Sequence, residues 1–164
     1  MCKNLDRKTA FFEEHEGRIF FTGKSMLPVI KPGCRLKVEH KGCCDIYIGD
    51  IVIFDNGREF VCHRVVGKYK AGNRVYFLER GDNAGCKNVN IVRKDRVIGK
   101  VIRAETFEGR IFHPENPISK TGKVRLQLLS FVFGLCHSLK RLFFGDRRNS
   151  FTRKIGSFIC RIFV

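Results

Sequence analysis

Apolar and polar residues alternate in short runs over the first two thirds of the chain. Branched and aromatic residues dominate these runs, and glycine-containing turns such as Asn56–Gly57 separate them. Runs of such residues bounded by turns predict β-strands joined by hairpins. The predicted strands are 18–21, 35–39, 51–55, 59–66, 74–79, 96–103 and 106–112. We therefore expect a mainly β domain of short antiparallel strands over residues 1–112.

The pattern changes to helical periodicity after a polar, proline-containing stretch at 113–122, which we interpret as a linker. Apolar residues then recur every three or four positions in 124–144 and again in 150–164. In the first segment, Leu128, Phe131 and Leu135 lie on the apolar face, and Ser130 and Gly134 lie on the polar one. Residues 123–164 are thus predicted to form an amphipathic helical tail.

The excess of basic residues in this tail predicts an anionic partner. The chain has a net charge of +16, and residues 120–164 contain ten basic residues and one acidic residue. Basic helices with an apolar face suit an anionic membrane surface, because their apolar side chains enter the acyl boundary while their cations meet headgroups. Two alternatives stay open: the helices pack their apolar faces on the β domain, or they bind nucleic acid nonspecifically.

Several classes of function are not expected. Only about 16 residues precede the first predicted strand, too few for a helix-turn-helix, so we expect no specific nucleic-acid binding. The histidines and cysteines lack metal-ligand spacing, and no glycine loop would cradle a phosphate, so we predict neither a metal nor a cofactor.

The expected location is the surface of a membrane. No apolar run reaches the roughly 20 residues that a membrane-spanning helix needs, and the polar start lacks a secretory signal. The eight cysteines lack the spacing of a disulfide framework, which indicates reduced thiols. We therefore expect a peripheral membrane protein, on the cytoplasmic side.

The candidate chemistry lies in Gly23-Lys24-Ser25-Met26-Leu27-Pro28, which follows an apolar strand. Taken alone, this is a serine in a glycine- and proline-containing turn. However, the segment resembles the nucleophile box of the type I signal peptidase superfamily, which includes the LexA-like autoproteases. Four further segments resemble the family's boxes in the same order, and together they cover residues 18–103. They are 49–54, 62–66, 81–84 and 97–101.

The resemblance implies a signal peptidase/LexA-like core and a serine endopeptidase. Ser25 would be the nucleophile. His63 would be its general base, since His63-Arg64 is similar to the His-Arg pair of the family's endoplasmic-reticulum and archaeal-like branch. Asp82, in the Gly-Asp-Asn turn, would orient the imidazole; alternatively it only caps its turn, and Asp95 is the remaining acidic candidate. The chain departs from the branch at 85–88, where another acid is often found.

The resemblance also suggests how the substrate is held. The backbone amides of Ser25 and Met26 are the predicted oxyanion donors. A peptide or protein substrate would bind as an extended strand, with small residues before the cut. Two alternatives from other classes stay open: a non-catalytic descendant that binds peptides, and a membrane-surface or nucleic-acid adaptor that acts through the basic tail.

Overall fold

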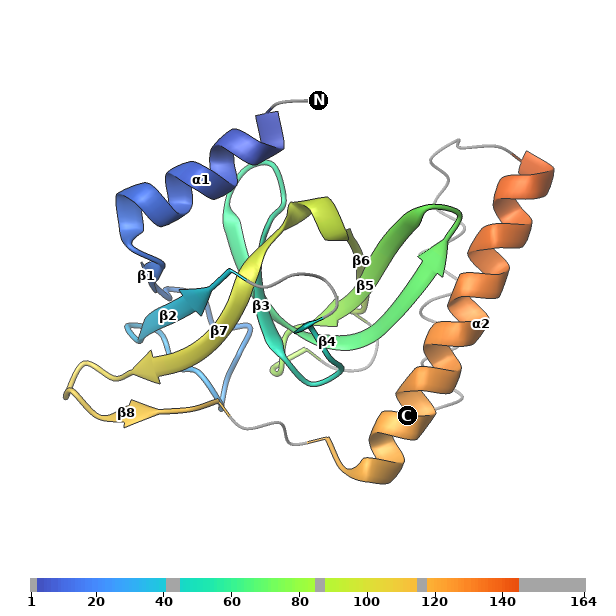
Figure 1. Ribbon diagram of the computed structural model, residues 1–164. Coiled ribbons are helices and arrows are strands. Elements are labelled where there is room, and N and C mark those ends of the chain that lie inside the picture. Colours follow the sequence, from blue (N-terminus) through green and yellow to red (C-terminus); the bar gives the residue numbers. More distant parts are fainter. Residues whose placement is uncertain (1–2, 41–44, 85–87, 115–117, 145–164) are drawn as a thin grey trace.

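The computed structural model describes residues 3–40, 45–84, 88–114 and 118–144, and it is mainly β, as predicted. The elements in chain order are α1 (Lys3–His15), β1 (Arg18–Phe20), β2 (Arg35–Glu39), β3 (Ile51–Asp55), β4 (Phe60–Ala71), β5 (Arg74–Arg80), β6 (Asn90–Arg93), the 3-10 helix η2 (Lys94–Arg96), β7 (Val97–Glu105), β8 (Ile111–Phe112) and α2 (Lys120–Phe144). The strands form one curved antiparallel sheet (Figure 1).

Within the described residues, the sheet order is β1-β2-β7-β3-β4-β5-β6, and β8 pairs with β7. β7 lies at the centre of this arrangement, since it pairs with β2, β3 and β8. β4 also has two partners, because its first half pairs with β3 and its second half with β5. This division leaves one side of the first half of β4 without a strand neighbour among the described residues.

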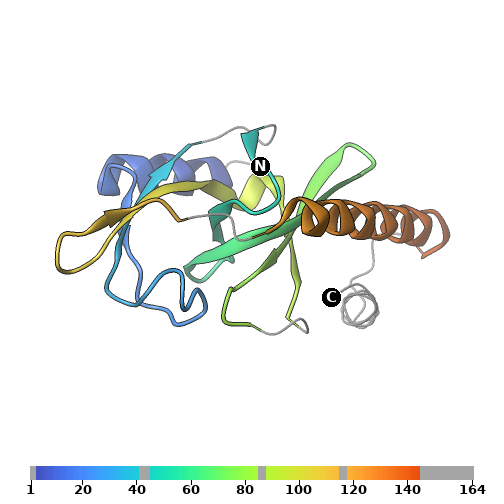
Figure 2. The same ribbon diagram turned by 90° about the horizontal axis from the view of Figure 1, so that it is seen from below.

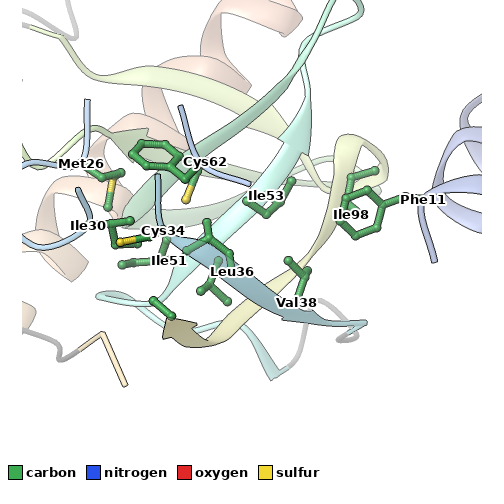
Figure 3. Close-up of a cluster of buried hydrophobic side chains, with 13 residues drawn as sticks. Phe11, Met26, Ile30, Cys34, Leu36, Val38, Ile51, Ile53, Cys62 and Ile98 are labelled. Carbon is green, nitrogen blue, oxygen red and sulfur yellow. The ribbon is translucent and has the colours of Figure 1, made fainter. Parts of the chain in front are cut away.

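The largest core cluster lies under the β1–β2 connection (Figure 3). Met26 and Ile30 come from this connection and have no exposed surface. They belong to the same buried cluster as side chains of β2, β3 and β7, including Leu36, Ile53 and Ile98. Buried apolar anchors on both sides of Pro28 therefore hold the segment that follows Ser25 against the sheet.

The predicted strands from 18 to 55 agree with the structure to within one residue; besides the short helix η2, two elements were not predicted. One is α1, whose Phe11 is buried and meets the Phe60 ring at 5.2 Å between centroids. The other is β6, which pairs with β5. The predicted strand 106–112 is reduced to β8, because Thr106 to Arg110 form a hydrogen-bonded turn.

The C-terminal helix α2 begins inside the predicted linker and runs alongside the β4–β5 hairpin (Figures 1 and 2). Ser130 and Gly134, from the face predicted to be polar, are buried against β4. A Cβ atom on Gly134 would lie only 3.2 Å from Tyr69 Cβ, so the small residues allow close approach. Leu128, Phe131 and Leu135 are exposed, so the alternative in which the apolar face packs on the β domain does not hold for these three residues.

No described helix combines the length and apolar composition that crossing a bilayer requires. The second amphipathic segment predicted in the tail, 150–164, lies outside the described residues.

Candidate active site

Ser25 lies in the β1–β2 connection, which two backbone hydrogen bonds close at its base. The Phe21 amide donates to the Cys34 carbonyl (2.8 Å), and the Gly33 amide donates to the Phe21 carbonyl (2.7 Å). The next residue, Met26, is fully buried, whereas Ser25 is partly exposed. The connection therefore presents the Ser25 side chain at the edge of the core while Met26 anchors the backbone beside it.

His63 lies on β4, and Nδ1 of its imidazole is hydrogen-bonded to Glu79 Oε2 on β5. The Glu79 side chain is only 2% exposed and that of His63 16%. Because a carboxylate only accepts hydrogen bonds, this contact places the Nδ1 proton on His63 and leaves Nε2 as the basic nitrogen. Glu79 thus holds the tautomer that a general base requires.

Asp82, which we had assigned to His63, contacts Arg64 instead. The guanidinium of Arg64 donates to both carboxylate oxygens, from Nε at 2.8 Å and from Nη2 at 2.6 Å. Its third nitrogen donates to the Gly49 carbonyl at 2.7 Å. Arg64 is 2% exposed, so this bidentate pair is largely buried and fixes the turn after β5 to β4. The structure corrects the predicted role of Asp82.

A β-bulge explains why Glu79, and not Asp82, contacts His63. From Ala71↔Arg74 to Gly67↔Leu78 the β4–β5 hairpin has one register, which, if continued, would set His63 opposite Asp82. The register shifts between Val65 and Gly67, and Val65 then pairs with Glu79. Because side chains alternate between faces, this shift of one residue moves Asp82 to the other face and brings Glu79 to the face of His63.

Helix α2 supplies a hydrogen-bond acceptor beside this bulge. The amide of Lys68, next to the bulge, donates to Ser130 Oγ at 3.1 Å, and Ser130 Oγ in turn donates to the Leu126 carbonyl at 2.7 Å. Gly67 provides the space, since a Cβ atom there would lie 2.4 Å from Ser130 Oγ. The helix therefore satisfies a backbone donor at the irregularity that sets the register of the site.

Ser25 and His63 converge beneath Gly81. A Cβ atom on Gly81 would lie 3.0 Å from Ser25 Cβ and 3.2 Å from His63 Nε2, so these two atoms are no farther apart than the sum of those distances. The Asn83 amide donates to the Ser25 carbonyl at 2.8 Å, which ties this turn to the serine loop. No hydrogen bond joins Ser25 Oγ to His63 among the described residues, although rotation of the hydroxyl about its Cα–Cβ bond changes its distance to Nε2.

Two cavities meet at Ser25. The larger is an open groove of about 760 Å³ that contains Ser25, His63 and Glu79 and continues toward β6. The smaller, of about 160 Å³, lies between β1 and the start of β4 and is lined mainly by apolar residues. Its lining residues are Ile19, Phe20, Phe21, Thr22, Gly23, Ser25, Leu36, Ile53, Glu59, Phe60, Val61 and Cys62. A chain lying in the groove would therefore pass the serine with a small apolar pocket beside it.

The two predicted oxyanion donors differ in access. Ser25 is partly exposed and lines both cavities. Met26 has no exposed surface, so its amide is closed to a substrate in this conformation. Asp95, the other acidic candidate, pairs with Arg93, and that hydrogen bond lowers the pKa of the Asp95 carboxyl.

Cys62 precedes His63 on β4. Burial, followed by the charge of Asp82, raises the pKa of the Cys62 thiol far above its ordinary value, which keeps it protonated beside His63. Within the described part of the chain, no three histidine, cysteine or acidic side chains gather as metal ligands.

Comparison with known proteins gives a distant relative. The chain is 29% identical over 96 residues to the signal peptidase complex catalytic subunit SEC11 of Pyricularia oryzae. The match covers 52% of this chain and 56% of that protein, so the chain spans about half the length of this relative. No family model matches the chain. The similarity supports the signal peptidase superfamily, at the level of the superfamily and not of a particular branch.

Proposed function

We propose that the protein is a serine endopeptidase that cuts a signal or leader peptide, or a partner protein, by acyl transfer. The observation that carries this proposal is the convergence of Ser25 Cβ and His63 Nε2 on Gly81, while Glu79 holds the far side of the imidazole. The similarity to SEC11 supports the same class of chemistry.

In the proposed reaction, Ser25 Oγ attacks the carbonyl carbon of the scissile peptide bond, and His63 Nε2 takes the hydroxyl proton. The Ser25 amide stabilises the resulting oxyanion; the Met26 amide joins it only after the loop shifts to expose it. His63 then gives its proton to the leaving amine, and an acyl ester remains on Ser25. Water attacks the ester with His63 as base again, which releases the acid product and regenerates the serine.

Glu79 takes the role that we had assigned to Asp82. A buried carboxylate against Nδ1 orients the imidazole and stabilises its protonated form during proton transfer. Asp82 has a different function in this proposal, because its pairing with Arg64 positions the turn that contains Gly81.

The substrate would bind as an extended strand between the serine loop and the start of β4. β4 pairs with β3 through Phe60–Arg64 but meets β5 only from Arg64 onward. The side of Val61–His63 that faces away from β3 therefore has no described strand beside it, and a peptide there would lie next to Ser25. The pocket of about 160 Å³ favours a small side chain before the cut.

The test is cleavage of a precursor that bears a signal peptide, followed by mass spectrometry of the products. Ser25→Ala and His63→Ala should each lower the rate at least a hundredfold, since loss of a general base alone costs about 10²–10⁴-fold. His113→Ala is the matched control, because His113 lies after β8 and contacts the Ile102 carbonyl. Equal cutting by all four proteins would show that the observed activity does not come from this site and would favour the peptide-binding alternative.

A further inference from the structure

A row of exposed apolar side chains runs along the face of α2 that points away from the sheet. Val124, Leu128, Phe131 and Leu135 are 55%, 57%, 70% and 52% exposed. Their spacing of four, three and four residues keeps them within a narrow angular range on an α-helix. We call this row the α2 stripe. Its opposite face, which includes Leu129 and Ser130, is buried against β4.

Positive charge surrounds the α2 stripe. Residues 120–144 contain five basic residues and no acidic residue. At 100° per residue, Lys123 and Arg125 lie on either side of Val124. Across the helix–sheet groove of about 450 Å³, the exposed Lys70 of β4 lines the same cavity as Phe131 and Leu135. Lys68 also lines this cavity, but its ammonium group donates to the Ile46 carbonyl at 3.4 Å. An apolar row flanked by cations of α2 and by Lys70 matches the interface of an anionic bilayer.

Other occupants fit this surface less well. A second copy of the chain would bring another five cations against the first five, and residues 145–164 of the same chain contain five basic residues and one acidic residue. Nucleic acid would satisfy the cations but would leave four apolar side chains facing a phosphate backbone. Of the occupants compared, only an anionic bilayer complements both the positive charge around the α2 stripe and its apolar side chains.

We propose that the α2 stripe docks on an anionic lipid membrane, with α2 lying parallel to its surface. The helix is rigidly joined to the candidate active site, because Ser130 binds the Lys68 amide on the same strand that contains His63. Gly67, which lies against Ser130, is four positions after His63. At the rise of a β-strand, four positions correspond to about 13 Å. Docking would therefore set the distance of the groove from the lipid surface. This proposal goes beyond the peptidase proposal and does not require it.

Tryptophan fluorescence can test the docking at a single position, because the natural chain contains no tryptophan. We would place one in the full-length chain, as Phe131→Trp in the α2 stripe or, as the matched control, as Phe107→Trp. Phe107 is 98% exposed and lies in the β7–β8 connection. Both proteins would be titrated with phosphatidylcholine vesicles with and without phosphatidylserine, and with acyl chains brominated to quench the indole. Circular dichroism would confirm that both variants are folded.

The proposal predicts a blue shift and bromine quenching for Phe131→Trp on phosphatidylserine vesicles, and neither effect for Phe107→Trp. Adding Arg125→Gln should weaken the partitioning about fivefold, since each cation near an anionic surface contributes about 1 kcal/mol. The absence of quenching at 131, or equal quenching at 107, would overturn the proposal. Equal quenching on vesicles without phosphatidylserine would overturn its electrostatic part. Blue-shifted emission of Phe131→Trp before lipid is added would show that protein already covers the α2 stripe, and this result would also overturn the proposal. If that emission changed with protein concentration, the covering protein would be a second copy of the chain.

Discussion

Glu79→Gln separates catalysis from folding at this site. The substitution keeps the volume of a side chain that is only 2% exposed and removes the charge that faces His63 Nδ1. The glutamine side chain can present its neutral carbonyl oxygen to Nδ1, which then keeps its proton. Alternatively, it presents its NH2 group, and because Nδ1 must then accept, the imidazole proton moves to Nε2. Both outcomes weaken the base, because the first leaves the imidazolium without its counter-charge and the second blocks Nε2.

The expected loss in kcat is about 10³–10⁴-fold, by analogy with removal of the charge from the acid of a Ser-His-acid triad. At about 1.4 kcal/mol for each factor of ten, this is a barrier increase of about 4–5.5 kcal/mol. The free energy of unfolding should change by less than about 1.5 kcal/mol, because a polar group of the same shape still meets the imidazole.

The assay is steady-state cleavage of the precursor, with urea unfolding of the same preparations. Glu108→Gln is the matched control, since it makes the same chemical change on an exposed residue of the β7–β8 connection. A folded Glu79→Gln protein with kcat within threefold of the parent would refute the assignment of Glu79.

Three further outcomes follow from the contacts around the site. Asp82→Asn should lower the free energy of unfolding by about 3 kcal/mol in urea titrations, because it leaves the buried Arg64 without its charged partner; a catalytic loss with unchanged stability would instead restore Asp82 to the triad. Ser130→Ala leaves the amide at the bulge without its acceptor and should cost about 1–3 kcal/mol, with Ser130→Thr keeping the hydroxyl; hydrogen exchange at the Lys68 amide that does not change would contradict this. With N-ethylmaleimide at neutral pH, Cys136 should react readily and Cys62 should not, because burial raises the pKa of the Cys62 thiol and removes it from solvent; mass spectrometry that finds Cys62 labelled in the folded protein would count against the buried placement.

Local patterns predicted most of the sheet but not its exact register. The β3–β4 connection at Asn56–Gly57 was correct, and Gly57 has the positive φ of 97° that such a turn favours. The next predicted strand, 59–66, was too short, because β4 continues past Gly67 to Ala71. The bulge there depends on α2, more than 60 residues away in sequence, and no local pattern reports such a contact. Gly67 within an apolar strand was the one available signal.

The bulge is also why Asp82, the predicted third catalytic group, does not contact His63 in the structure. The family resemblance alone suggested Asp82; in the unshifted register Asp82 would face His63, whereas in the structure it contacts Arg64. Helix α2 presents a similar case. Its periodicity was clear from sequence, but which face packs on the sheet was not: packing buries the small residues Ser130 and Gly134 and leaves the larger apolar row exposed.

The measurement that tests the account most directly is an acid quench of the first turnover with excess enzyme, followed by peptide mapping. The account predicts a transient ester between the N-terminal product and the Ser25 hydroxyl, which forms more slowly in His63→Ala and Glu79→Gln and never in Ser25→Ala. Cleavage that proceeds in Ser25→Ala, or an adduct on another side chain, would contradict the proposal that these residues form the active site.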